Sequence, residues 1–504
     1  MKDWVRLHGE DHVIVALRSF AKGEILELDM GAVAARGTVR IELREDIPKG
    51  HKVLVQPVRK GEPIRKFGYS IGKAREDLVP GCWVHTHNME TGLKGFIDYT
   101  YEPTEPVQET EAAAPLTFPG YVREGGDVGV RNEIWIINTV GCINKTCETL
   151  ARRADALYRG RIDGVYHFAH PFGCSQLGDD LKYTQALLAS LVRHPNAGGV
   201  LVVGLGCENN QIDSFKQAIG EFDPLRIRFM KAQEEEDELE MGLELIEQLV
   251  EHAERFLREP VSISKLRIGL KCGGSDGLSG ITANPLVGAV SDRLTGMGGT
   301  TILTEVPEMF GAETILMNRA ADEKVFDQIV RLINDYKQYF IRYDQEIYEN
   351  PSPGNIEGGI STLEEKSLGC TQKGGHAVVV DVVGYGGRVS KPGLNLLEAP
   401  GNDLVSVTAL AAAGAHIVLF TTGRGTPFGG PVPTVKISTN SELAVRKKNW
   451  IDFNAGQLLE GKPMDRLTDE LWALIVSIAS GESEARNEQN GFREIAIFKD
   501  GVIL

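Results

Sequence analysis

The sequence predicts an α/β protein that carries a small all-β module at its N-terminus. Residues 1–98 contain short β-rich runs, such as HVIVAL and HKVLVQPV, separated by turn signals such as PKG and VPG. After residue 121, short apolar runs alternate with longer helical patterns, which is typical of βαβ units and a mostly parallel sheet. Between these two regions, residues 99–120 form a linker with four prolines and four glutamates.

The α/β region, residues 121–504, should have helices on both faces of its sheet. Its apolar runs include EIWIINTV, GGVLVVGLG, LRIGLKCG and AHIVLFTTG, which are nearly continuous, as in strands that are buried on both sides. Between residues 239 and 257, apolar side chains recur on one helical face after an acidic first turn. This region is long enough to hold two subdomains.

Composition excludes several classes of protein. The chain has 504 residues with 70 acidic and 54 basic side chains, a formal net charge of -16, which argues against nucleic acid as a partner. No run reaches the roughly 20 apolar residues of a membrane span. Seven cysteines are too few for a disulfide framework, and the N-terminus does not look like a secretory signal. We therefore expect a soluble, reduced, cytoplasmic protein.

Reactive side chains collect in glycine-rich loops that follow the predicted strands. Because ligands bind beyond the carboxyl ends of strands in open α/β sheets, these loops should converge on one rim. Among them are NTVGCIN, FAHPFGCSQLGDD, VVGLGCENN, LKCGGSDGLSG and LTEVPEMFG. The strand-end cysteines they carry are Cys142, Cys174, Cys207 and Cys272. Thiolates select iron, zinc or Fe–S clusters, although each cysteine could also be a buried apolar residue.

The remaining cysteines have other contexts. Cys82 and Cys147 lie in a β-module strand and a helical stretch, so we expect them to be structural, and Cys370 in LGCTQKGG allows either interpretation.

Three histidines are candidates for proton transfer. His85 and His87 form an H-x-H pair whose period of two puts both rings on one face of a strand, where they could bind a metal or act as acid and base, or lie at a domain interface. His170 follows an apolar strand and precedes a proline, a position that favours a general base at the rim.

Basic residues at the rim would hold an anionic substrate. Arg424 lies between glycines that leave its guanidinium accessible for a carboxylate, and Arg131 and Lys436 are further candidates; any of them could instead form a surface salt bridge. The chain lacks a Walker loop and a clean GxGxxG fingerprint, so we expect no NAD. A nucleotide-dependent dehydrogenase and a non-catalytic carbohydrate-binding protein are the rival classes.

Long motifs throughout the chain resemble the altronate dehydratase and galactarate dehydratase family of sugar-acid hydro-lyases. They include GDVGVRNE, FGCSQLGDD, GLGCENNQ, CGGSDGLSGITANP, LTEVPEMFGAE, NPSPGN and TGRGTPFGGPVPTVKI. HTHN, GCSQLGDD, EVPEMFGAE and NWIDFNAG are more similar to the altronate branch, while the galactarate branch and a more distant sulfolactate-lyase branch remain alternatives.

The resemblance implies a SAF, or β-clip, domain at the N-terminus and a Rossmann-like C-terminal region. It further implies dehydration of D-altronate to 2-dehydro-3-deoxy-D-gluconate in hexuronate catabolism, dependence on iron(II), and a homodimer. Its metal site would lie in the C-terminal part. Manganese(II) is the alternative metal.

These expectations combine into one mechanism. A metal held by Cys174, Cys207 and Cys272, with Glu208 or Asp276 as oxygen ligands, would stabilise the charge that develops on the substrate. His170 would remove the C2 proton, and His85 and His87 would act as acid or complete the metal shell. The residues expected to bind the sugar acid are Arg424, Arg131, Lys436, Ser275 and Asn440.

Overall fold

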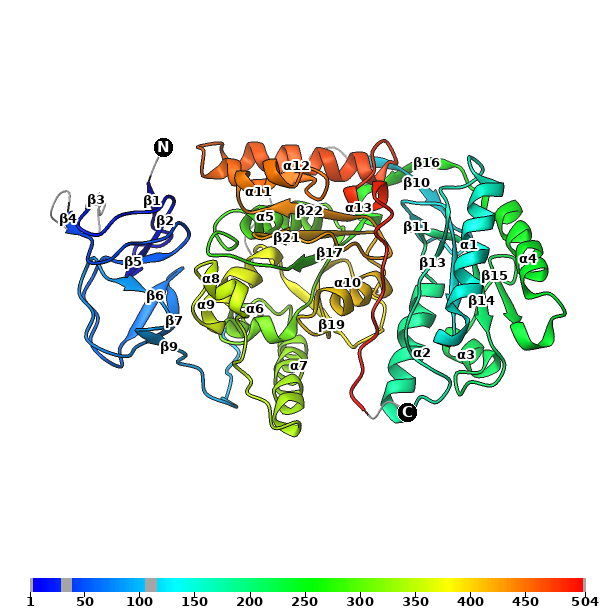
Figure 1. The fold of residues 1–504 in the computed structure, drawn as a ribbon, viewed down its shortest axis with the longest axis horizontal. Helices are drawn as coiled ribbons and strands as arrows, with labels where there is room; N and C mark the ends of the chain where they lie inside the picture. The colour runs from blue at the N-terminus through cyan, green and yellow to red at the C-terminus, as the bar shows by residue number, and fades with distance from the viewer. Residues whose placement is uncertain (1–2, 29–38, 105–115, 502–504) are drawn as a thin grey trace.

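The computed structural model describes residues 3–28, 39–104 and 116–501, which form three regions (Figure 1). The N-terminal β-module lies at one end, and the last region in the sequence lies in the middle. A second α/β region, formed by the residues that follow the linker, lies at the other end. The α/β fold with a β-module, as predicted, is confirmed, but the strands after the linker form two parallel sheets rather than one, together with a small antiparallel sheet.

The β-module consists of short antiparallel strands around two small cores. Alternate residues of β3 are buried, which is typical of a strand with one face on a core. One sheet contains β1 (Trp4–Val5), β2 (Val13–Ala16), β5 (Lys52–Leu54) and β8 (Trp83–Val84). The others contain β3 (Ile25–Leu28) and β4 (Val39–Glu42), and β6 (Pro63–Lys66), β7 (Tyr69–Ala74) and β9 (Met89–Glu90).

The segment expected to be a linker is partly structured where it is described. Tyr99 donates a hydrogen bond to Glu313 at 2.6 Å, and Tyr101 donates to the carbonyl of Ala320 at 2.8 Å, so its first part packs on the middle region. Its last residues begin strand β10 (Thr117–Val122), which pairs with two other strands. These are β11 (Val128–Gly129) and β16 (Arg258–Ser262). The part between, residues 105–115, lies outside the described residues.

The second region is a four-stranded parallel sheet in the order β13-β12-β14-β15 with helices on both faces. Every residue of β12 and β14 is buried, as the continuous apolar runs predict. The strands are β12 (Glu133–Asn138), β13 (Val165–His167), β14 (Ala197–Gly204) and β15 (Ile227–Lys231). The helices are α1 (Asn144–Tyr158) and α4 (Glu238–Ala253) on one face, and α2 (Gly178–Val192) and α3 (Ile212–Ile219) on the other.

Helix α4 corrects one boundary of the sequence-based prediction. Asp237 caps it by accepting hydrogen bonds from the backbone of Leu239 and Glu240, and the predicted apolar face packs on the sheet. The helix ends at Ala253, and Leu257, expected on that face, is 77% exposed beyond the end.

The middle region is a seven-stranded parallel sheet in the order β19-β20-β18-β17-β21-β22-β23. Its strands are β17 (Arg267–Cys272), β18 (Thr300–Leu303), β19 (Val379–Val383), β20 (Gly393–Leu397), β21 (Ile417–Thr422), β22 (Thr434–Ser438) and β23 (Phe453–Asn454). Its longer helices are α5 (Ala283–Gly296), α7 (Glu323–Arg342), α9 (Leu363–Cys370), α10 (Asp403–Ala412) and α12 (Met464–Ala479). Its short helices are α6 (Glu313–Met317), α8 (Pro353–Glu357), α11 (Ser441–Arg446) and α13 (Arg486–Gln489).

The C-terminal segment runs between the two sheets, and its Ile495 and Ile497 are buried in the core that they share (Figure 1). No helix among the described residues is long and apolar enough to cross a lipid bilayer.

A buried ion-pair triad fixes the β-module to the middle region. Lys52 and Lys66 of the module both donate to the carboxylate of Glu365 on α9, each at 2.8 Å, and all three side chains are almost fully buried. Burial alone would raise the pKa of Glu365, but Lys52 and Lys66 outweigh it and lower this pKa to about 2. Burial lowers the pKa of Lys52 to about 8, because desolvation exceeds its attraction to Glu365.

Glu365→Gln should loosen this contact, because it leaves two buried ammonium groups without a counter-charge. Breaking a buried pair from one side costs about 3–5 kcal/mol, so urea unfolding at pH 7 should show a loss of that order. Glu27→Gln, which removes the exposed partner of Arg40, is the matched control and should leave stability unchanged.

The contribution of Glu365 to the free energy of unfolding depends on pH in a defined direction. Because the pKa of Glu365 falls from 4.5 to about 2 on folding, its stabilisation is present above pH 4.5 and lost as the pH falls toward 2. The stability of Glu365→Gln should therefore not show the loss that the Glu365 carboxylate causes in the parent protein between pH 4.5 and about 2. Equal stability of the two proteins at pH 7 would contradict the role of the triad.

Candidate functional site

The candidate site lies at the carboxyl ends of the central strands of the seven-stranded sheet. The chain leaves β17 toward β18 on one side, and β21 returns on the other side of β17, so the strand order reverses there. Ligands of open α/β sheets bind at such a switch point. Strand β17 ends at Cys272, and the loop after β18 brings Glu305 and Glu308 beside it.

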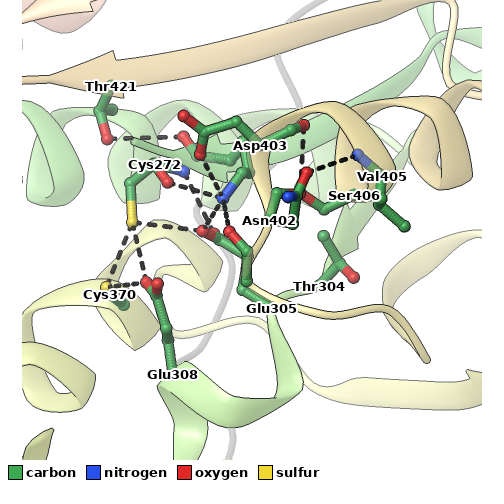
Figure 2. A network of polar contacts seen from close by, with 12 residues as sticks. Cys272, Thr304, Glu305, Glu308, Cys370, Asn402, Asp403, Val405, Ser406 and Thr421 are labelled. Atoms are coloured by element: carbon green, nitrogen blue, oxygen red, sulfur yellow. Dashed lines mark hydrogen bonds and ion pairs between the residues drawn. The ribbon is translucent and has the colours of Figure 1, made fainter. Parts of the chain in front are cut away.

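Two thiols and a carboxylate meet in a buried cluster (Figure 2). The Sγ atom of Cys272 lies 3.2 Å from Sγ of Cys370, the last residue of α9. One oxygen of Glu308 lies 3.1 Å from Sγ of Cys370 and 3.6 Å from Sγ of Cys272. Cys370, for which the sequence left both interpretations open, therefore belongs to the site.

Three buried lysines surround this cluster. Lys373 places Nζ 3.0 Å from Sγ of Cys272 and 3.0 Å from Glu305. Lys366 donates to Glu308 at 2.8 Å, and Lys271 donates to Glu305 and lies 3.1 Å from Asp403. These lysines were not expected from the sequence, because Lys366 and Lys373 stand among polar residues and resemble ordinary surface lysines, and Lys271 has no charged neighbour in the sequence that indicates a partner.

The carboxylates and lysines hold each other in their charged forms. Burial would raise the pKa of Glu308, but Lys366 and Lys271 outweigh it and lower this pKa to about 2. Burial opposes the charge of Lys373, but Cys272 and Glu305 raise its pKa well above the ordinary value. The hydrogen bond with Cys272 and burial raise the pKa of Cys370.

Glu305 adopts a left-handed backbone conformation with φ of 72°. This conformation is unfavourable for a residue with a side chain, by about 1–3 kcal/mol. The contacts of its carboxylate with Lys271, Lys373 and the backbone N–H of Cys272 offset that strain. The turn thereby aims Glu305 back at the end of β17.

The donor set fits a divalent metal ion. Cys272, Cys370 and Glu308 each offer a ligand atom, and these atoms all lie within 4.8 Å of one another. Around them, three ammonium groups face three carboxylates, those of Glu305, Glu308 and Asp403. A divalent ion adds two positive charges, which the two thiols balance by losing their protons.

Four of the predicted site residues lie together in loops at the same end of the sheet. Asp276 is half-buried and accepts hydrogen bonds from Thr439 at 2.9 Å and from Asn440 at 3.4 Å. Ser275 is buried beside it, and its carbonyl accepts from Asn355. Arg424 lies on the loop after β21, half-exposed, and pairs with Glu357 at 2.9 Å. A side chain at Gly423 would collide with Asp276, so this glycine permits the close approach of the two loops.

A pocket opens between these loops, α9 and the β-module. Its lining includes Ser275, Asp276, Lys366 and Cys370 from the middle region and Lys66 with Phe67 from the module. His85 is buried at the same interface and bonds through Nδ1 to Ser361 at 2.9 Å, while His87 packs against Trp83. Burial lowers the pKa of His85 to about 4, so its ring is neutral at pH 7.

The remaining predicted residues lie elsewhere. Cys174, Cys207, Glu208 and His170 belong to loops of the four-stranded sheet, whereas Cys272 belongs to the seven-stranded sheet. The predicted site residues therefore lie at the edges of two separate sheets and not at the edge of one sheet. Glu208 accepts from the backbone of Leu205 and Gly206 and from Thr139, and both ring nitrogens of His170 are hydrogen-bonded.

Arg131 and Lys436 are both buried. Arg131 forms a bidentate pair with Glu488 at 2.8 and 2.9 Å, so its guanidinium is committed to an internal partner. Lys436 lies within β22, and burial lowers its pKa to about 8, against the attraction of Asp452.

The fold and site define an α/β enzyme with a docked SAF-type module and a buried thiol–carboxylate–lysine centre. Family models match all three regions: the altronate/galactarate dehydratase SAF domain at residues 2–92, the second domain of D-galactarate dehydratase/altronate hydrolase at 120–254, and the D-galactarate/altronate dehydratase C-terminal domain at 263–503. The chain belongs to the D-galactarate/altronate dehydratase family.

The relatives cover essentially the whole chain. It is 52% identical to altronate dehydratase of Escherichia coli over 99% of this chain and 100% of that protein. It is 51% identical to altronate dehydratase of Bacillus subtilis over 100% of both chains. Identity to galactarate dehydratase (L-threo-forming) of Escherichia coli is 31% over 98% of this chain and 96% of that protein.

Cys370→Ser should weaken metal binding at the cluster, because serine keeps the volume but not the soft thiolate ligand. We expect a loss of at least about tenfold in Co(II) affinity, together with weaker thiolate-to-cobalt absorption, because only Cys272 still supplies a thiolate. Cys82→Ser, in the β-module, is the control and should bind as the parent protein does. Unchanged cobalt spectra in Cys370→Ser would remove this cluster as a metal site.

Proposed function

We propose that the protein dehydrates D-altronate to 2-dehydro-3-deoxy-D-gluconate and water. The observation that carries the proposal is the identity of 52% and 51% with two altronate dehydratases over the full chain, against 31% with a galactarate dehydratase. The buried cluster of Cys272, Cys370 and Glu308 supplies chemistry that suits this reaction.

The reaction removes the proton on C2 and the hydroxyl on C3 of a sugar acid whose carboxylate is ionised. Negative charge develops on the carboxylate and C2 oxygens, and preorganised cations stabilise it. We propose that Cys272, Cys370 and Glu308 hold the metal ion. The proposed metal is iron(II), and manganese(II) is the alternative. Such an ion, when bound, acts as a Lewis acid toward the carboxylate and hydroxyl oxygens.

Other residues of this chain would stabilise charge, donate a proton and bind the substrate. Lys366 and Lys373 stay protonated and add positive charge beside the cluster, where an ammonium can also donate a proton to the departing hydroxyl. Arg424, Ser275 and Asn440 lie at the same end of the sheet, which suits binding of the sugar-acid carboxylate and hydroxyls. Asp276 lies among them, and desolvation raises the pKa of its carboxyl group.

Histidines of the β-module remain candidates for the base. His85 is neutral at pH 7 and can accept a proton, and the module that carries it and His87 closes one side of the pocket. Closure by Lys66 and Phe67 would exclude water from the reacting groups. His170, Cys174, Cys207 and Glu208 lie in the second region, so we assign them no step at this pocket.

We further propose that the protein works in the cytoplasm and as a homodimer. The free thiols of the buried cluster support a reducing compartment. The homodimer is supported by the family resemblance.

A panel of aldonates and aldarates, assayed as 2-keto acid product under anaerobic conditions with Fe(II), tests the substrate. We expect D-altronate to be the best substrate by kcat/KM. Faster turnover of galactarate would assign the protein to the other branch of the family, and no product from any sugar acid would overturn the proposal.

Lys366→Met tests, in the same assay, whether the ammonium group of Lys366 contributes to catalysis. Removing one preorganised cation should lower kcat on D-altronate by about 10²–10³-fold. Lys391→Met, which removes an exposed lysine paired with Asp381, is the matched control and should keep full activity.

A further inference from the structure

Three cysteines of the second region gather at one rim that the proposed reaction does not use. Cys142 follows β12, Cys174 lies between β13 and α2, and Cys207 follows β14, and these are three adjacent parallel strands. All three thiols are exposed. The four other cysteines lie elsewhere: Cys82 in the β-module, Cys147 on the buried face of α1, and Cys272 with Cys370 in the buried cluster.

Hydrogen bonds tie the three cysteine loops to one another. The N–H of Gly141 donates to the carbonyl of Phe172 at 2.7 Å, which joins the Cys142 and Cys174 loops. The N–H of Asn209 donates to the carbonyl of Cys174 at 2.8 Å, which joins the Cys174 and Cys207 loops. The backbones are therefore held in place without any bond between the sulfurs.

Glu208 connects the loops after β12 and β14. Its carboxylate accepts from Thr139 and from the N–H groups of Leu205 and Gly206. A side chain on Gly141 would come within 2.6 Å of the carbonyl of His170, so only glycine allows this approach of the loops. We therefore assign Glu208 to positioning the loops rather than to binding a metal.

This rim is the switch point of the four-stranded sheet. The chain leaves β12 for β13 on one side, and β14 lies on the other side, so the loops after β12 and β14 diverge and open a crevice between them. Helices α1, α2 and α3 all begin within a few residues of the three cysteines. Their N-termini provide partial positive charge that favours an anionic group of thiolates and sulfides.

The three thiols are not close enough together to hold one tetrahedral metal ion. Among the described residues, Cys142, Cys174 and Cys207 do not form a group whose ligand atoms all lie within 4.8 Å. A single tetrahedral ion with bonds of about 2.3 Å needs its sulfur ligands closer than that. A cubane cluster presents its irons to thiolates that stand farther apart, and cysteine thiolates are its usual ligands.

We propose that Cys142, Cys174 and Cys207 bind a 4Fe–4S cluster at this rim. The three thiols lose their protons on binding, and one iron is left without a cysteine ligand on the exposed side of the crevice. Gln233 lies 3.9 Å from Sγ of Cys207 and would donate an N–H···S contact of the kind that tunes cluster potentials.

The test is anaerobic purification of the full chain, reconstitution with Fe(III), dithiothreitol and sulfide, and measurement of iron, acid-labile sulfide and the EPR spectrum after reduction with dithionite. The parent protein should contain iron and sulfide in equal amounts, apart from the single iron of the Cys272, Cys370 and Glu308 site, and show a cluster signal. Cys142→Ser, Cys174→Ser and Cys207→Ser should each lose that signal while keeping the circular dichroism of the parent.

Cys272→Ser and Cys370→Ser are the matched controls, since they alter the thiols of the other site, and both should keep the cluster. Iron bound without sulfide, or no iron bound at this rim, would overturn the proposal. A cluster that persists in all three serine variants of the rim would overturn it as well. The measurement uses no sugar acid, so its outcome is independent of the proposed dehydration.

Discussion

The structure depends on compensation of charge in the interior of the middle region. Lys271, Lys366 and Lys373 would each be costly to bury alone, and they are stable only because Glu305, Glu308 and Asp403 face them. The left-handed turn at Glu305 is offset by the same contacts. The network keeps two thiols and a carboxylate close together. Its three ammonium groups and three carboxylates balance, so in a chain with a net charge of -16 a divalent ion bound at the cluster would supply the local positive charge that a sugar acid needs.

The β-module extends this network rather than forming a separate unit. Glu365, which neutralises Lys52 and Lys66, lies on α9, the helix that also carries Lys366 and Cys370. Docking of the module and placement of the cluster are therefore coupled through one helix. Because Lys66 and Phe67 line the pocket, the module also determines how much water reaches the reacting groups.

Sequence periodicity predicted the fold class well, because buried parallel strands and amphipathic helices leave strong local patterns in the chain. It could not show that the strands form two sheets, since pairing between distant strands has no local signal; Cys174 and Cys207 were for that reason grouped with Cys272. The strand-end rule located Cys272, Ser275 and Asp276 at the rim of the middle region, with Arg424 on a neighbouring loop. Lys271 and Lys373 were missed, because a buried lysine is recognised only by its partner, and the shared partner here, Glu305, lies 34 residues from Lys271.

Anomalous diffraction at the iron edge, from crystals grown without oxygen in the presence of Fe(II) and D-altronate, tests the central claim most directly. The account predicts an iron peak bounded by Cys272, Cys370 and Glu308, with the sugar-acid carboxylate within reach of it. Iron elsewhere with none in this cluster, or substrate bound away from it, would contradict the account.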